Sequence, residues 1–230
     1  MLDNAYKGTG QFKRPVKNIR ALGALYPEVV QLVTLKRSNI KTFKDLKNKS
    51  VSSGSPGAGS WIVLGEISKL YGMDRNKDLK EDYSSFTQST EKIKDGNLTA
   101  SLIVGGVPIS AVVELSNGHP THIVDLKGKE VDDFLKRTKY YAKYTMPANT
   151  YKGQDKPVET IAVRAVWATH KDLPEAVAYE VVKQLYENVD TLAKVHPKGK
   201  EITLNTALES ITIPLHPGAE RYYREKGIKK

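Results

Sequence analysis

Val51-Ser52-Ser53-Gly54-Ser55-Pro56-Gly57-Ala58-Gly59-Ser60 is the stretch of sequence that decides the fold. A short strand runs into a loop of glycine, proline and serine, and Trp61–Tyr71 then has the apolar spacing of a helix that stops at Gly72. Such a loop presents backbone N–H groups and the positive end of a helix dipole. The stretch therefore predicts a strand–loop–helix unit suited to a small anion.

The side chains of this loop indicate which anion it suits. Gly57 and Gly59 permit close approach of the backbone, and Ser55 and Ser60 add hydroxyl groups. Ser60 stands where a Walker A loop needs lysine, and Trp61 stands where it needs a hydroxyl for magnesium. The loop thus favours a carboxylate over a nucleotide, and a turn without a ligand is the alternative. We expect the ligand contacts of this loop to be Ser55, Gly57, Ala58, Gly59, Ser60 and Trp61, with unpaired amides from residue 57 to residue 61.

A second loop of the same kind is Gly105-Gly106-Val107-Pro108. It follows the apolar run Leu98–Val104 and precedes a helix of small residues, Ile109–Ser116. Two such loops facing one crevice form a wall of a binding cleft, so Gly105, Gly106, Val107 and Pro108 are further predicted contacts. The alternative is a turn that needs a positive φ at glycine.

The rest of the chain alternates between strand and helix patterns, which predicts an α/β fold with mostly parallel sheets. Tyr26, which ends a predicted strand before Pro27, is the tyrosine best placed to line a cleft. The other predicted strands are Val29–Leu35, His122–Val124, Lys143–Met146 and Thr160–Ala168, and the other predicted helices are Thr87–Asp95 with Thr87 as its cap, Glu130–Arg137, Pro174–Tyr186 and Glu220–Lys226.

Composition excludes several classes of function. The 230 residues include no cysteine, so disulfides and thiolate zinc sites are excluded, and His119 and His122 lack a metal-binding pattern. The net charge of +10 comes from lysines scattered among acids, which predicts a solvated surface and no nucleic-acid partner. No membrane span and no signal peptide is visible. The sequence lacks the G-x-S-x-G motif that forms the nucleophile elbow of hydrolases. We expect that the protein is not an enzyme and binds no cofactor.

Several separated motifs resemble one family, the TAXI family of TRAP-transporter solute-binding proteins. The resemblance runs from about Ala5 to the end of the chain, and the stretch from Ile40 to Gly59 matches the family pattern. The other motifs are Gly8-Thr9-Gly10-Gln11-Phe12, Leu22-Gly23-Ala24-Leu25-Tyr26-Pro27-Glu28, Lys94-Asp95-Gly96, Gly105-Gly106-Val107-Pro108, Pro147 to Asp155, Ala162 to Ala165, Asp172-Leu173-Pro174 and Pro214 to Tyr223.

The resemblance implies a type II periplasmic-binding-protein fold, in which two lobes close about a hinge over one ligand. We expect residues 1–46 and 140–230 to form the first lobe and residues 47–139 the second. The ligand is expected to be a carboxylate or an acidic amino acid such as glutamate, which a monomer hands to an ion-driven TRAP-type permease in the periplasm. Family members begin earlier, with an export signal and a first strand, so we expect the signal peptide and part of the first lobe to have been lost by truncation.

Two rival functions share this fold. A ligand-sensing effector domain is usually joined to a DNA-binding helix-turn-helix, and none is visible in the sequence. A transferase acting on a small anion needs a convergent acid and base, and the sequence shows no such set.

Overall fold

The computed structural model describes residues 1–138 and 140–229. The chain folds as two compact units. We call Glu28–Val163 the central unit, and Met1–Pro27 together with Arg164–Lys230 the terminal unit. The lobe boundaries expected from the sequence fall after residues 46 and 139 and stay a prediction, and residue 139 itself lies outside the described residues.

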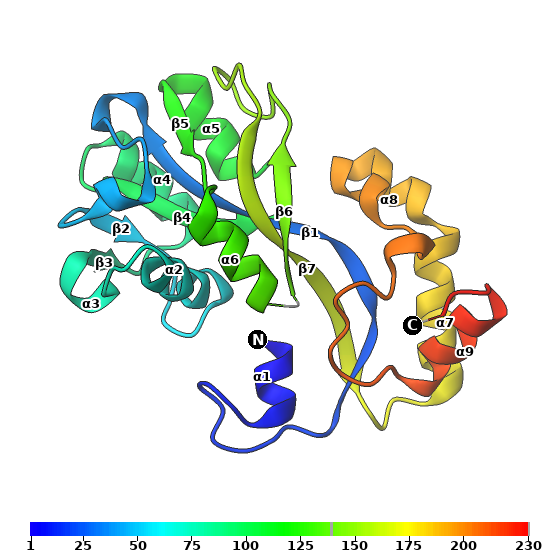
Figure 1. Cartoon of the computed structure of the whole chain (residues 1–230). Helices are drawn as coiled ribbons and strands as arrows, with labels where there is room; N and C mark the ends of the chain where they lie inside the picture. Colours follow the sequence, from blue (N-terminus) through cyan, green and yellow to red (C-terminus); the bar gives the residue numbers. More distant parts are fainter. Residues whose placement is uncertain (139, 230) are drawn as a thin grey trace. The chain divides into compact units, whose positions relative to one another are not determined.

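Among the described residues, seven strands form one sheet in the order β3-β2-β4-β1-β7-β6, and β5 pairs with β1 (Figure 1). The strands are β1 (Ile19–Leu35), β2 (Ser50–Ser52), β3 (Lys80–Asp82), β4 (Ala100–Gly105), β5 (Thr121–Val124), β6 (Tyr141–Met146) and β7 (Val158–His170). The helices are α1 (Leu2–Lys7), α2 (Gly59–Leu70), α3 (Arg75–Asp78), α4 (Phe86–Lys94), α5 (Ser110–Gly118), α6 (Lys129–Arg137), α7 (Glu175–Glu187), α8 (Val189–Val195) and α9 (Pro217–Glu225), with four short 3-10 helices at Lys36–Ser38, Phe43–Leu46, Pro197–Glu201 and Leu204–Thr206.

The α/β class expected from the sequence is confirmed, but the expectation of a mostly parallel sheet is wrong. β2 runs parallel to both β3 and β4, whereas β1 runs antiparallel to β4 and β5, and β6 runs antiparallel to β7. The reason is β1, which pairs Val29 with Gly105 and Thr34 with Ala100. The parallel order is therefore confined to β3, β2 and β4.

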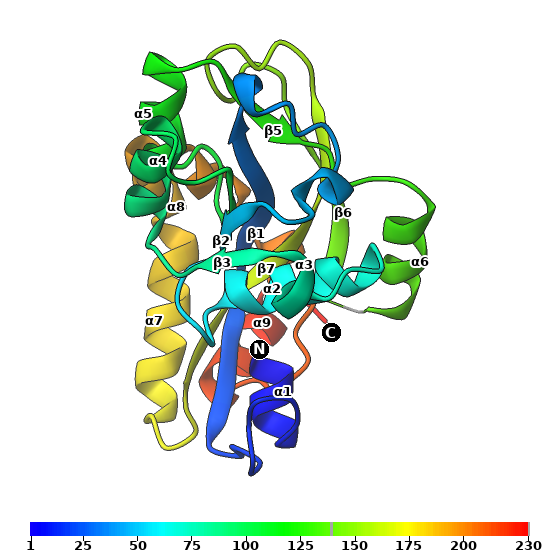
Figure 2. The ribbon, with the colours of Figure 1, turned by 90° about the vertical axis from the view of Figure 1, so that its left-hand side faces the viewer.

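β1 is one continuous strand of 17 residues, where the sequence suggested two strands separated by Pro27 (Figure 2). Proline lacks an N–H group, but its fixed φ is compatible with extended backbone, so it interrupts the hydrogen bonding without ending the strand. Residues 25–28 are half-buried, between fully buried stretches on either side. Tyr26 consequently lies within a strand and not at its end.

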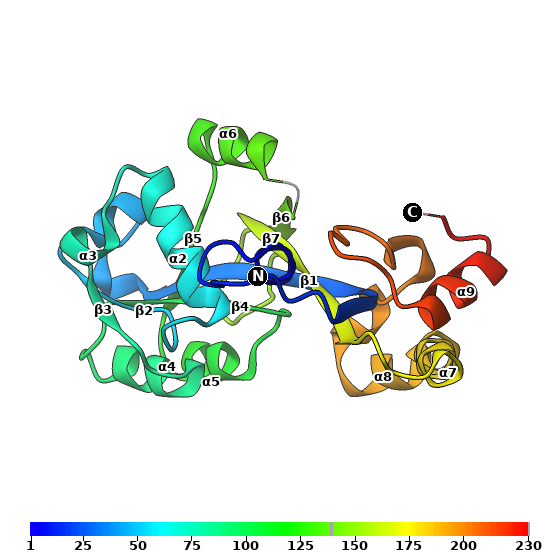
Figure 3. The ribbon, with the colours of Figure 1, turned by 90° about the horizontal axis from the view of Figure 1, so that it is seen from below.

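Helices cover both faces of the sheet in the central unit (Figure 3). On one face, α2 and α6 pack over an apolar cluster that includes Val30, Leu32 and Leu64. On the other face, α4 and α5 pack over a cluster that includes Val33 and Ile103. Successive residues of β1 serve opposite clusters because side chains alternate across a strand, and two-sided burial explains why the run reads as continuously apolar.

The terminal unit packs α7 against α9 around Tyr222 and Tyr223, which are both 1% exposed. A Cβ added at Gly218 lies 2.2 Å from the Glu175 carbonyl oxygen, so the close approach of the two helices needs glycine there. His216 is buried; its Nδ1 accepts the Gly218 N–H, and its Nε2 therefore donates to the Leu173 carbonyl at 2.9 Å. His216 thus has a structural role at the start of α9.

No helix among the described residues is both long enough and apolar enough to span a membrane.

Candidate functional site

The candidate site lies at one edge of the central unit. Because β3, β2 and β4 are parallel, their carboxyl ends meet at the same edge of the sheet, and ligands of open α/β sheets bind at such edges. Each of these strands leads through a short loop into the N-terminus of a helix, which is α4, α2 and α5 respectively. Both loops singled out by the sequence therefore lie on this edge, and the loop after β3 joins them.

The loop after β2 turns at Gly57, which has a φ of 87°. The N–H of Ala58 donates to the Ser55 carbonyl at 3.0 Å and closes this turn. That amide is consequently not free, which corrects the expectation of unpaired amides throughout residues 57–61. Ser55 itself is exposed.

The first turn of α2 does present free amides. Ala58 precedes the helix and offers no side-chain cap, and no described group accepts the N–H of Gly59, Ser60 or Trp61. A Cβ placed on Gly59 would meet nothing within 4 Å, so the space beside this residue is open. Three amides without an acceptor thus lie at the positive end of a 12-residue helix, which favours a negatively charged group.

The Ser60 hydroxyl has a structural role that the sequence did not reveal. It is 6% exposed and donates to the Ser53 carbonyl at 2.6 Å, so its proton is used to hold the loop against the end of β2. Ser53 follows β2 directly, and its own hydroxyl is buried without a hydrogen-bond partner among the described residues. Such orphaned buried polar groups are costly and rare. Sequence reasoning missed Ser53, whose one signal is its place at a strand end.

Trp61 is fixed in place by Arg75. The guanidinium lies 4.2 Å from the centroid of the indole ring, and Nη1 donates to the Trp61 carbonyl at 2.7 Å. Arg75 also pairs with Glu81 through two hydrogen bonds, and both side chains are largely buried. The Nε1 of Trp61 is buried and has no acceptor in the described chain.

The loop after β4 is not the glycine turn with a positive φ that was the alternative to a binding loop. Neither Gly105 nor Gly106 has a positive φ, so a left-handed turn does not explain these glycines. A Cβ on Gly105 would instead lie 3.1 Å from Cδ1 of Ile109. Val107 is buried in the core, and Pro108 is half-buried.

The start of α5 is held by Tyr151. The Ile109 N–H donates to the tyrosine oxygen at 3.0 Å, and the hydroxyl donates to Oε1 of Gln31 at 2.6 Å. Burial raises the pKa of Tyr151 to about 12, against the opposing effect of these hydrogen bonds, so the phenol stays protonated at neutral pH. The amide beside Pro108 is therefore used by the protein and is not offered to a ligand.

The loop after β3 completes the edge and was not recognised in the sequence. Ser85 and not Thr87 caps α4, because its hydroxyl accepts the Gln88 N–H at 3.4 Å and the Gln88 side chain accepts the Ser85 N–H. The serine–glutamine spacing of a capping box was the available signal.

An acidic residue that is paired with a lysine also lies on this edge. Asp82 ends β3 and accepts hydrogen bonds from Nζ of Lys92 at 2.6 Å and from the Ser84 N–H at 2.9 Å. Desolvation raises the pKa of Asp82, but these hydrogen bonds outweigh it and lower the pKa to about 2. The carboxylate is thus ionised and paired, which limits its repulsion of an anion at the neighbouring helix.

Tyr26, the remaining predicted contact, belongs to the terminal unit, and its role as a ligand contact stays a prediction. Among the described residues, no cluster of His, Cys, Asp and Glu has the arrangement of a metal site.

A family model described as the NMT1-like family matches residues 1–227. The chain belongs to the NMT1-like family. The motifs of the TAXI family, which the sequence resembles, remain a finer prediction within this assignment.

Three solved structures that are similar to this NMT1-like chain come from work on binding proteins and importers. The periplasmic aliphatic sulphonate binding protein SsuA from Escherichia coli is 14% identical over 93% of this chain and 70% of its own length, with a TM-score of 0.46. A structure from work on glutathione import in Streptococcus mutans is 13% identical over 85% of this chain and 68% of its own, with a TM-score of 0.49. A putative L-cystine ABC transporter protein from Listeria monocytogenes is 16% identical over 85% and 69%, with a TM-score of 0.46. These are likenesses of fold.

Proposed function

We propose that this protein binds a small organic anion on the outer side of the cytoplasmic membrane and delivers it to a transporter in that membrane. The proposed anion is a carboxylate or an acidic amino acid such as glutamate. The observation that carries the proposal is the first turn of α2, where the amides of Gly59, Ser60 and Trp61 have no acceptor among the described residues and the space beside Gly59 is open. Membership of the NMT1-like family and the transporter-type motifs of the sequence support the same function.

The free amides of this turn select a ligand by its negative charge more than by its shape. A hydrogen bond from a backbone amide to an ionised oxygen contributes about 1.5–3 kcal/mol, roughly twice the value for a neutral acceptor. Two carboxylate oxygens can accept from the three amides of the turn, and the buried Ser53 hydroxyl at the end of β2 is a further unused donor. We propose that Trp61 limits the size of the ligand and that Gly105 to Pro108 and Tyr26 add further contacts.

The identity of the permease is the finer part of the proposal. The sequence motifs favour a TRAP-type permease driven by an ion gradient, whereas the structures named above include proteins of ABC importers. Reconstitution of the protein with the permease of its own gene neighbourhood in vesicles distinguishes the two. We expect uptake of the anion to follow an imposed sodium or proton gradient without ATP, and uptake that needs ATP overturns the TRAP assignment.

Calorimetry tests the binding function directly. We expect a panel of mono- and dicarboxylates to yield one that binds 1:1, and the amide analogue of that ligand, such as glutamine for glutamate, to bind at least tenfold more weakly. The amide is the matched control because it has nearly the same shape without the charge. Absence of binding across the panel, or equal binding of the acid and its amide, contradicts the proposal.

A further inference from the structure

Glu28 is a partly buried acid on the sheet edge that carries the candidate site. It precedes Val29, which pairs with Gly105, the last residue of β4, so Glu28 lies at the carboxyl end of that strand. Val29 packs with the apolar cluster that α4 and α5 cover, and Val30 packs with the cluster that α2 and α6 cover. Because side chains alternate across a strand, Glu28 points to the same face as Val30, which is the face of α2.

The carboxylate of Glu28 has no hydrogen bond and no ion pair with any described residue. Burial raises the pKa of Glu28, and neither a hydrogen bond nor a cation of the described chain lowers it. Removing a charged group from water without a partner costs free energy, so partly buried carboxylates are normally paired. Glu28 therefore requires a positively charged partner at the edge where open α/β sheets bind their ligands.

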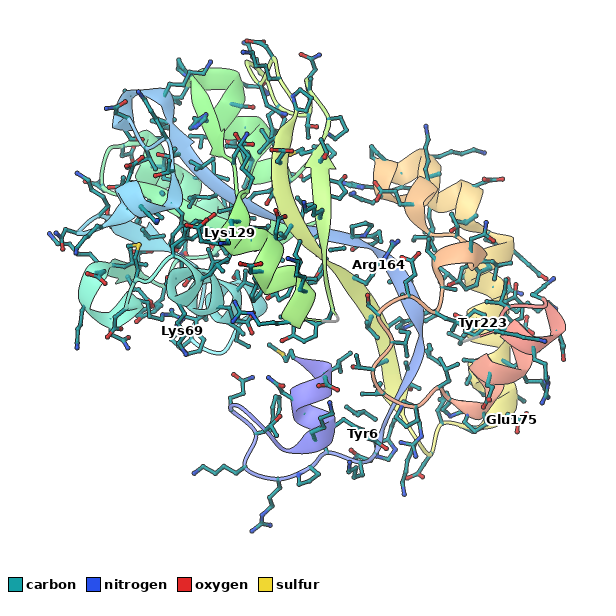
Figure 4. The ribbon with its side chains drawn as sticks, in the orientation of Figure 1. Tyr6, Lys69, Lys129, Arg164, Glu175 and Tyr223 are labelled. Carbon is teal, nitrogen blue, oxygen red and sulfur yellow. The ribbon has the colours of Figure 1, made fainter. Side chains whose placement is uncertain are left out.

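The cations of the elements around this edge do not supply that partner. Lys69 of α2, labelled in Figure 4, lies in the last turn of the helix, at the opposite end from the free amides. Arg75 and Lys92 each form an ion pair with a carboxylate of β3. In the described part of the chain, these three side chains leave Glu28 without a counter-charge.

A second carboxylate on the same face lacks a cation as well. Glu66 lies in α2, and its Oε2 accepts the hydroxyl hydrogen of Tyr141 at 2.5 Å. Tyr141 packs with Val30 in the cluster that α2 covers. Glu66 forms no ion pair with a described residue. Two negative charges on this face weaken the binding of a ligand that carries negative charge alone, because like charges repel.

We propose that Glu28 binds a protonated amine of the ligand, whose carboxylate binds the free amides at the start of α2. The inference rests on the proposed function and narrows its ligand from a small carboxylate to an amino acid. β1 and β2 are separated by β4, which places them about 10 Å apart. The Glu28 side chain covers part of that distance, so a ligand a few bonds long spans the rest.

This pairing determines specificity. A hydrogen bond between charged groups is roughly twice as strong as one between neutral groups. A site whose polar group pairs with the ligand also rejects an analogue that lacks the matching group, because the group of the site is then left unpaired. Glu28 is thus expected to favour amino acids over acids of the same length without an amine.

Pairs of ligands that differ only in the amine test the inference by calorimetry. The pairs are glutamate with glutarate, aspartate with succinate, and alanine with propionate. We expect the parent to bind the amino acid of at least one pair roughly tenfold or more tightly than its partner. If the acids without an amine bind as tightly as the amino acids, the inference is overturned and the proposed function stands. If no acid binds, both are overturned.

Glu28→Gln removes the charge and nearly keeps the shape of the side chain. We expect it to weaken binding of the amino acid by roughly tenfold or more and to leave binding of the paired acid unchanged or tighter. Glu91→Gln is the matched control, because Glu91 is exposed on α4, which covers the other face, and this variant should bind like the parent. An equal loss for both members of a pair indicates a structural role for Glu28 and overturns the inference.

Thermal unfolding without ligand gives an independent measurement. If the carboxylate is unpaired in the folded protein, glutamine removes a desolvated charge, and the Tm of Glu28→Gln should lie above that of the parent. The Tm of Glu91→Gln should equal that of the parent. A lower Tm for Glu28→Gln shows that the protein itself pairs Glu28 and overturns the inference.

Discussion

Gly59→Ala separates binding from stability at the candidate site. Gly59 is the first residue of α2, its φ is not in the left-handed region, and an added methyl group meets nothing within 4 Å. The folded chain therefore accepts alanine without strain. The methyl group instead occupies the open space through which a ligand reaches the amides of Ser60 and Trp61.

The substitution is expected to raise the stability of the protein and to lower its affinity for the ligand. Replacing a helical glycine by alanine stabilises a protein by about 0.5–1 kcal/mol, which corresponds to roughly 2–4 °C per kcal/mol in Tm for a chain of this size. A ligand displaced by a methyl group loses at least one charge-assisted hydrogen bond of about 1.5–3 kcal/mol. Since 1.4 kcal/mol is a factor of ten, we expect Kd to increase by roughly 10- to 100-fold.

Calorimetry and thermal unfolding measure the two effects on the same samples. Gly118→Ala is the matched control, because Gly118 is also a terminal helical glycine with nothing within 4 Å of an added Cβ, and it lies at the C-terminal end of α5. We expect the control to bind like the parent. If Gly59→Ala is folded and its Kd stays within twofold of the parent, the amides of α2 do not hold the ligand and the reasoning is refuted.

Four further substitutions test the local structure by chemical unfolding. Ser85→Ala should destabilise the protein by about 1 kcal/mol through loss of a helix cap, and Thr87→Ala should have little effect. A larger loss of stability for Thr87→Ala than for Ser85→Ala would show that Thr87 is the cap. Lys92→Met should lower the unfolding free energy by about 1 kcal/mol at pH 7. Because the folded pKa of Asp82 is depressed, its contribution is present above pH 3.8 and is lost as the pH falls to about 2, so the difference from the parent should shrink over that range, and a constant difference argues against the pair. Arg75→Met should cost about 3 kcal/mol by leaving a buried carboxylate unpaired, and a cost below 1 kcal/mol contradicts that role.

Local patterns in the sequence were sufficient to predict most helices and the α/β class. The helix predicted at Trp61–Tyr71 is α2 at Gly59–Leu70, and Gly72 does adopt a left-handed φ of 71° after it. These features depend on residues within one or two turns, so a single segment contains the information. The two loops singled out by their glycines also lie on one sheet edge, although their roles as ligand contacts stay a prediction.

The features that the sequence did not reveal depend on distant partners. Whether Pro27 ends a strand depends on the neighbouring strands, and here β1 continues through it. The Ser60 hydroxyl was expected to face a ligand, but it donates its hydrogen bond to the Ser53 carbonyl. Tyr151 reaches the Ile109 amide across 42 positions of sequence, a contact that no local spacing encodes.

The division of the chain into a continuous central unit and a discontinuous terminal unit has a consequence during synthesis on the ribosome. Residues 1–27 are made before the central unit but find their partners in the terminal unit only after residue 163 has been made, an interval of about ten seconds at typical elongation rates. The central unit can become compact within that interval, because all its residues are contiguous. Residues 1–27 meanwhile expose apolar side chains that are later buried, such as Leu22 and Ala24, and a chaperone can bind them during that interval.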